Sequence, residues 1–268
     1  LTVDGSLATG GAVAVMCMLN GANTYVALIL AFLAGMLAGL VTGLFHTALG
    51  IPPILAGILT QLGLYSINMR IMGKANQAIN VDKYDLLVSL RFIRNVPLFK
   101  NTILLVSLII VVLIVILYWF FGTELGCSLR ATGCNPNMSR AQGINTDVCK
   151  VLGLMISNGL VALSSALLAQ YQGFADVNMG RGAIVIGLAA VIIGEAIFGK
   201  IFRNFALRLL SVAFGSILYY LVLQTVIWMG IDTDLLKMLS ALVVAVFLAV
   251  PYWKAKYFSK PVKRGGNK

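Results

Sequence analysis

Few residues in this chain have the types and spacing that could support metal, nucleotide or nucleophilic chemistry. His46 is the only histidine, which excludes a zinc site built from several histidines. Residues 194–201 nearly match a phosphate-binding loop, but Ile201 stands where a magnesium-binding hydroxyl is required, so nucleotide binding is not expected. No Cys-x-x-Cys pair occurs, so we expect inert thiols rather than a metal site at Cys17, Cys127, Cys134 and Cys149. With one histidine and scattered acids, the chain is not expected to be an enzyme.

Two ionisable residues fall within apolar stretches and are therefore candidates for a transport function. Asp4 and Glu195 each stand beside a glycine near the end of such a stretch. A charged group at membrane depth is costly and is usually functional, although both residues could instead lie at the water interface. We predict that segments 1–20 and 52–70 contribute to a translocation pathway, with six candidate lining residues: Asp4, Gly5, Ser6, Gln61, Asn158 and Glu195.

Composition shows what kind of protein could carry these residues. The chain has 268 residues, of which 60% are hydrophobic and 11% are charged, and its mean hydropathy is +0.95. Soluble domains carry roughly 25% charged residues, so a soluble or disordered protein is excluded. The net charge of +11 is not read as a nucleic-acid partner, because basic residues set topology in membrane proteins. We predict an all-α polytopic membrane protein embedded in the lipid bilayer.

The apolar residues are grouped into long segments, as expected for helices that need about 20 residues to cross a bilayer. The first and sixth segments are short, which is typical of discontinuous helices beside a transport pathway, or of simple variation in packing. Because the chain opens on Leu1 within an apolar stretch, we expect that residues upstream of it are missing. The eight predicted segments are 6–20, 24–46, 52–70, 102–121, 151–171, 183–199, 209–229 and 237–253.

The second segment carries small residues at every fourth position. This spacing places them on one face of a helix, where a second helix can approach closely in lipid. We expect a packing role, without further function, for Ala27, Ala31, Gly35, Gly39 and Gly43.

The distribution of lysine and arginine predicts the orientation in the membrane. The tail 254–268 holds six bases and no acid, so we place it in the cytoplasm. Alternation of the spans then places loops 122–150 and 200–208 inside, and loops 172–182 and 230–236 outside. Loop 71–101 also falls outside although it is basic, and its segment 84–96 is predicted to form a short surface helix.

The most specific pattern lies in the predicted cytoplasmic stretch 126–145. Asn135 is a good helix N-cap and Pro136 a good first helical residue. We predict a turn from Gly133 to Pro136, a short helix over 137–142 and a stop at Gly143. A capped helix of this kind between two spans is either a docking element or an ordered loop.

Residues 130–145 read Arg-Ala-Thr-Gly-x-Asn-Pro-x-Met-x-Arg-x-x-Gly-Ile-Asn. This pattern resembles the cytoplasmic coupling segment of bacterial ABC importer permeases, in the family of the branched-chain amino acid and ribose permeases. Residues 1–6, 46–60, 68–73 and 193–195 resemble the tryptophan/tyrosine permease subgroup of that family.

The resemblance implies a permease domain over 1–253, a coupling segment over 126–150 and a basic tail over 254–268. It implies a multi-pass protein of the bacterial inner membrane that imports an amino acid or similar small solute. Its partners would be a second copy of the chain, cytosolic ATPase subunits that bind the ATP, and an external substrate-binding protein. A secondary transporter or channel without an ATPase is the alternative. The residues that would contact the ATPase are Arg130, Gly133, Asn135, Pro136, Met138, Arg140, Gly143, Ile144 and Asn145.

Overall fold

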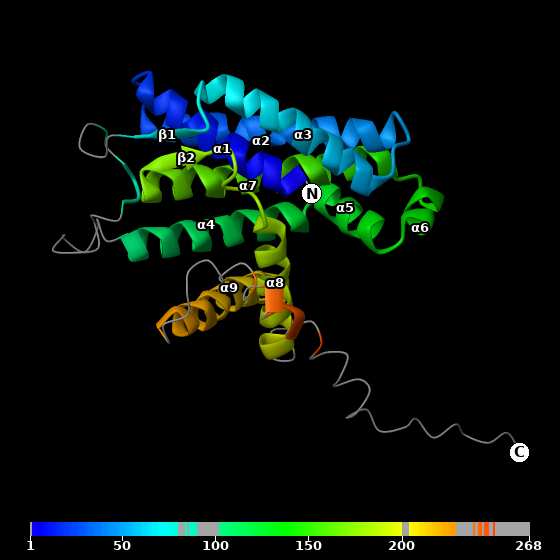
Figure 1. The fold of residues 1–268 in the computed structure, drawn as a ribbon. Helices are drawn as coiled ribbons and strands as arrows, with labels where there is room; N and C mark the ends of the chain where they lie inside the picture. The colour runs from blue at the N-terminus through cyan, green and yellow to red at the C-terminus, as the bar shows by residue number, and fades with distance from the viewer. Residues whose placement is uncertain are drawn as a thin grey trace, which may run out of the picture. The chain divides into compact units, whose positions relative to one another are not determined.

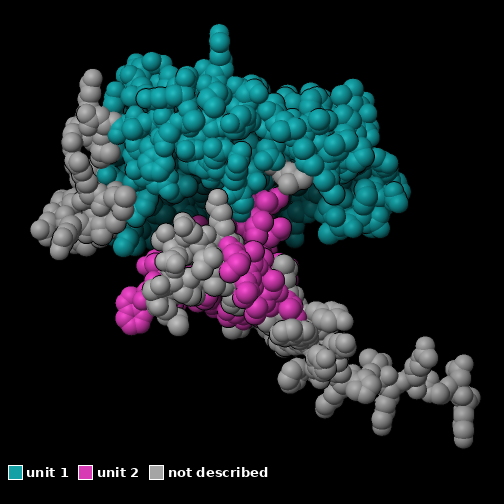
Figure 2. Space-filling view, in the orientation of Figure 1, with its two compact units in different colours: residues 1–183 teal, residues 184–268 magenta. Residues whose placement is uncertain are grey.

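A computed structural model describes residues 2–79, 84, 86–89, 102–199, 204–228, 238, 241–242, 244–246 and 249. The chain divides into two compact units, residues 1–183 and residues 184–268, which are coloured separately in Figure 2. Within the described residues, six helices are long and apolar enough to cross a membrane. They are α1 (Thr2–Leu19), α2 (Thr24–Thr47), α3 (Pro53–Met72), α4 (Thr102–Gly122), α7 (Thr146–Gln172) and α9 (Phe205–Trp228).

Seven of the eight predicted segments correspond to helices, and the structure corrects the beginnings of α1, α7 and α9, the last of which begins at Phe205 rather than at 209. Helix α1 begins at Thr2, so Asp4 lies in its first turn rather than before the helix. Helix α7 begins at Thr146, five residues before the predicted 151, because Asn145 caps its first turn. Helix α8 (Ala183–Phe198) has 16 residues and remains short, as predicted. Segment 237–253 lies largely outside the described residues, and so does 84–96, whose described residues 84 and 86–89 are not helical.

The first unit is built around the close packing of α2 on α7. All five predicted small residues of α2 are buried. A methyl group added to Gly39 would overlap the backbone of Leu154, and one added to Gly35 would overlap that of Asn158. The two backbones can therefore approach because glycine lacks a side chain, which is how helices commonly associate in lipid.

Helix α1 lies at the centre of this unit. It contacts α2, α3 and α7, and its residues Ala12, Ala14 and Val15 are fully buried. Helix α4 differs, because Thr102 is its only buried residue. Its apolar side chains are exposed or half-buried, and exposed ones such as Ile103 and Trp119 are available to lipid.

A short sheet marks one end of the first unit. Strand β1 (Asn76–Ala78) pairs antiparallel with β2 (Phe174–Asp176), with Gln77 opposite Ala175. The pairing places the chain after α3 and the chain after α7 on the same side, as the predicted topology requires of loops 71–101 and 172–182. Two short helices, α5 (Glu124–Cys134) and α6 (Pro136–Ala141), lie at the opposite end (Figure 1).

The second unit contains α8 and α9. Glycines again allow close approach, since a methyl group on Gly194 would overlap the backbone of Ser211. Ala189, Ile193, Tyr219 and Val244 form its buried apolar cluster.

Candidate functional site

The predicted coupling segment forms two short helices joined at a single residue. Helix α5 continues through Cys134, so Gly133 is helical, and the predicted turn from Gly133 to Pro136 is wrong. The chain changes direction at Asn135 alone, whose φ and ψ are −152° and 98°. The Asn135 side chain accepts a hydrogen bond from the Met138 backbone N–H at 3.1 Å. Pro136 then opens α6, as predicted, because its missing N–H would have no partner in a first turn.

The end of α6 is fixed by a glycine and by hydrogen bonds to its last turn. Helix α6 spans Pro136–Ala141, one residue earlier than the predicted 137–142. Gly143 adopts φ +81°, a conformation that favours glycine, and its N–H donates to the Arg140 carbonyl at 3.0 Å. The Ile144 N–H donates to the Ser139 carbonyl, also at 3.0 Å. The predicted stop at Gly143 is confirmed.

Side chains connect α6 to the beginning of α7. The Arg140 Nε–H donates to Thr146 Oγ1 at 2.8 Å, and Thr146 is buried. Asp147 Oδ1 lies 3.4 Å from a guanidinium nitrogen of Arg140 and 3.4 Å from Lys150 Nζ. Asn145 caps α7 by accepting from the backbone N–H groups of Asp147 and Val148. The segment is therefore held on the spanning helix α7.

The structure brings the nine predicted coupling residues to one end of the first unit. Eight of them are exposed and Ile144 is half-buried. Ser139 is buried and turns its side of α6 inward, while Met138 is 59% exposed. The element thus presents a protruding, internally braced surface.

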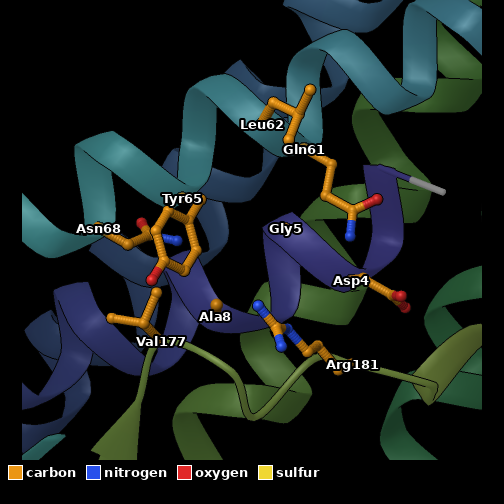
Figure 3. A pocket seen from close by; sticks show the side chains of 9 residues that line it. All are labelled: Asp4, Gly5, Ala8, Gln61, Leu62, Tyr65, Asn68, Val177 and Arg181. Atoms are coloured by element: carbon orange, nitrogen blue, oxygen red, sulfur yellow. The ribbon is translucent and has the colours of Figure 1, made fainter. Parts of the chain in front are cut away.

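A polar cavity of about 370 Å³ opens in the first unit between α1, α3 and the chain that follows β2 (Figure 3). Because Gln61 lies near the middle of the 20-residue α3, the cavity reaches about half-way along a helix long enough to span a bilayer. The lining residues are Asp4, Gly5, Ala8, Gln61, Leu62, Tyr65, Asn68, Val177 and Arg181.

Three of the predicted pathway residues, Asp4, Gly5 and Gln61, line this cavity. Tyr65, Asn68 and Arg181 are absent from the predicted set. Tyr65 and Asn68 follow Gln61 by four and seven residues, so helical periodicity could have identified them as one face of α3. No comparable signal places Arg181 beside α1.

The remaining predicted pathway residues lie elsewhere. The Ser6 hydroxyl donates to Asn158 Oδ1 at 2.8 Å, and the Asn158 amide donates to the Leu154 carbonyl at 2.8 Å. Ser6 and Asn158 therefore join α1 to α7 through a buried hydrogen bond. Glu195 lies on α8 in the second unit, where it is exposed.

Irregular backbone forms one wall of the cavity. Residues 177–182 are non-helical, and the Gly182 N–H lies 3.4 Å from Asp4 Oδ2. A methyl group on Gly180 would overlap the Asp4 backbone, so the loop packs directly against the first turn of α1. Non-helical backbone at membrane depth is tolerated where it is buried in protein or lines a polar cavity. The wall of the cavity therefore combines the first turn of α1 with the irregular chain that follows β2.

The comparisons with known proteins agree with this architecture. Residues 1–250 match the family described as the permease component of branched-chain amino acid transport systems. A tyrosine transport system permease protein of Clostridioides difficile is 38% identical over 93% of this chain and 80% of its own length. An uncharacterized protein of Rickettsia prowazekii is also 38% identical, over 93% of this chain and 86% of its own.

A more distant relative is the autoinducer 2 import system permease protein of Yersinia pseudotuberculosis, 30% identical over 71% of this chain and 52% of its own length. No solved structure matches the chain significantly. The family match covers nearly the whole sequence and includes both the braced α5–α6 element and the residues of the polar cavity. This multi-pass membrane protein belongs to the family of permease components of branched-chain amino acid transport systems.

Proposed function

We propose that this chain is the membrane-spanning subunit of an ATP-driven importer in the bacterial inner membrane. It would receive an amino acid or similar small solute from an external binding protein and move it inward. The observation that carries the proposal is the α5–α6 element, which projects from the bundle and is braced on a spanning helix. The similar tyrosine transport permease supports the amino acid as the solute.

Energy would enter through the coupling residues. Docking requires an accessible surface, which the exposed α6 provides through Met138 and its neighbours. Transmission of movement requires a stiff connection, and the Arg140–Thr146 hydrogen bond joins α6 to α7. Closure of two cytosolic ATPase subunits on ATP would then shift the bundle between its outward-open and inward-open states. This assignment places α5, α6 and the tail 254–268 in the cytoplasm.

The polar cavity is the proposed route of the solute. Its lining contains one carboxylate, Asp4, and one guanidinium, Arg181. An amino acid carries an ammonium and a carboxylate, which such a pair can complement by charge-assisted hydrogen bonds. Gln61 adds a neutral amide that can both donate and accept.

A second copy of the chain would cover the open side of this cavity. Leu62 is 64% exposed and Tyr65 is 41% exposed, and Arg181 is also exposed in the single chain. A homodimer with one cavity in each copy would cover these side chains and enclose the pathway.

The coupling assignment is tested by the double variant Arg140→Glu, Gly143→Pro. The first change reverses the charge that braces α6, and the second forbids the φ of +81° at its end. We expect loss of ATPase association and of uptake in proteoliposomes. Lys74→Glu, a charge reversal at an exposed site at the opposite end of the unit, is the control and should retain both. Normal association and uptake in the double variant would contradict the assignment.

The same proteoliposomes separate this proposal from a secondary transporter. An ATP-driven importer takes up solute in this assay only when the ATPase subunits and ATP are both present. Uptake by the permease alone, driven by an ion gradient without ATP, would instead identify a secondary transporter.

A further inference from the structure

Asn68 is a buried polar residue without a structural explanation. Its side chain is fully buried on α3. Among the described residues, neither its amide oxygen nor its amide nitrogen has a hydrogen-bond partner. A buried amide without a partner is destabilising, so such groups are rare and commonly mark a site of function.

Asn158 provides a matched comparison within the same unit. It is also an asparagine in a spanning helix and is 2% exposed. Both of its amide atoms are used, because the oxygen accepts from Ser6 and the nitrogen donates to the Leu154 carbonyl. The bundle can therefore satisfy a buried asparagine, and the unused amide of Asn68 is a local feature of its position.

Asn68 lies at one end of the polar cavity. Asn68 lines the cavity together with Tyr65 and Val177, which lie beside it in Figure 3. Gln61 lies seven residues earlier on the same face of α3, about 10 Å away along the helix axis. The Gly5 backbone packs against Gln61, so Asp4 belongs to the Gln61 end. The cavity therefore has charge at one end and an unused amide at the other.

A carboxamide both donates and accepts hydrogen bonds. The group that satisfies it best is a hydroxyl, or another group that can donate and accept together. The Tyr65 ring lies beside Asn68 in Figure 3, where a flat or apolar section of a solute can pack. The complementary solute is an amino acid with a long side chain that ends in such a polar group.

Resting on the proposed function, we propose that Asn68 is a specificity-determining residue of the pathway. Its amide hydrogen-bonds the terminal polar group of the solute side chain while the head group occupies the charged end. A site built to hydrogen-bond a substrate group rejects an analogue that lacks the group, because its own polar atoms then stay unpaired. Solutes with a terminal hydroxyl should therefore pass more efficiently than their deoxy analogues.

The test measures ATP-driven uptake of tyrosine and of phenylalanine, two amino acids that differ by one terminal hydroxyl. The complete transporter is used with one binding protein throughout, so the selectivity of that protein cancels when variants are compared. We expect Asn68→Leu to lower the tyrosine-to-phenylalanine ratio of uptake efficiency by about tenfold, mainly through loss of tyrosine uptake. Asn68→Ser, which keeps a group that donates and accepts, should retain part of the ratio.

Thermal stability supplies a second readout that a structural role would move in the opposite direction. Asn68→Leu removes an unpartnered buried amide, so its Tm should rise by a few degrees. Asn158→Leu breaks two hydrogen bonds and should lower the Tm.

Two failures are distinguishable. The role of Asn68 would be overturned if Asn68→Leu kept its uptake and its tyrosine-to-phenylalanine ratio, or if its Tm fell as that of Asn158→Leu does. Either result would leave the proposed importer function unaffected. Absence of ATP-driven uptake of any amino acid by the unaltered transporter would overturn the proposed solute class, and the role of Asn68 with it.

Discussion

The two ends of the first unit treat their polar groups in opposite ways. At the α5–α6 end, the side chains of Asn135, Arg140 and Asn145 are engaged by neighbouring residues. In the cavity, Asn68 has an amide with no partner among the residues that the structure describes. The polar side chains of the α5–α6 end are therefore satisfied by neighbouring residues, whereas the cavity lining includes an amide that can still form hydrogen bonds.

Under the proposed function, the difference corresponds to two separable tasks. An element that transmits movement must keep its shape in every state, so its internal bonds are satisfied. A passage for a solute must exchange bonds with that solute, so part of its capacity stays available. Helices α2 and α7 pack closely against each other, because the glycines of α2 allow almost no separation between them. We therefore expect changes in the cavity to leave ATPase association unaltered, and changes at the α5–α6 end to leave solute selectivity unaltered.

The largest expected effect comes from removing the positive charge of the cavity. Arg181→Gln should reduce uptake by about tenfold or more, because the proposed route would lose its guanidinium and a hydrogen bond to a charged group contributes about 1.5–3 kcal/mol. Association with the ATPase should be unchanged. Arg70→Gln, an exposed arginine on α3 outside the cavity lining, is the control. Uptake assays and co-purification of the ATPase check this prediction, and equal uptake by the two variants would contradict a role of Arg181 in the solute route.

An intermediate effect is expected at the cap of α6. Asn135→Ala removes the side-chain acceptor for the Met138 N–H, and loss of such a cap costs about 1 kcal/mol. Affinity for the ATPase should fall about fivefold, while solute selectivity stays the same. Asn76→Ala, at an exposed asparagine of β1 at the opposite end of the unit, is the matched control. A titration of ATPase subunit against purified permease measures both, and a change in selectivity would show that the two ends are not separable.

The smallest effect is expected from the ion pairs beside α6. Asp147 is 52% exposed at its side chain and contacts Arg140 and Lys150 at 3.4 Å. Exposed pairs of this kind contribute less than about 1 kcal/mol, so Asp147→Asn should weaken ATPase association only slightly. The deficit should disappear at high salt because the charges are then screened. A deficit that persists in high salt would indicate that Asp147 contacts the partner directly.

Local patterns made much of the membrane architecture and of the coupling element predictable. Apolar length located seven helices, and the spacing of Gly35, Gly39 and Gly43 identified the face of α2 that packs on α7. Asn135, Pro136 and Gly143 act on their own neighbours, so the bounds of α6 were predicted to within one residue. The beginning of α7 was missed because Asn145 caps a polar first turn that hydropathy does not detect.

The cavity could be predicted only in part, because it is assembled from distant segments. Asp4, Asn68 and Arg181 come from three parts of the chain and meet only after α1, α3 and the irregular loop have packed. The predicted lining residues included Asn158, which does not line this cavity, and omitted Asn68, which does. The two asparagines differ in their hydrogen bonds, because Asn158 binds Ser6, 152 residues away, and the Leu154 carbonyl, whereas neither amide atom of Asn68 has a partner among the described residues.

The most direct test of separable ends measures ATPase co-purification and solute uptake on the same membranes for two variants. Arg181→Gln alters the cavity, and the double variant Arg140→Glu, Gly143→Pro alters the coupling element. The account predicts that the first keeps the ATPase subunit and loses uptake, and that the second loses the ATPase subunit. Normal uptake by Arg181→Gln, or retention of the ATPase subunit by the double variant, would contradict it.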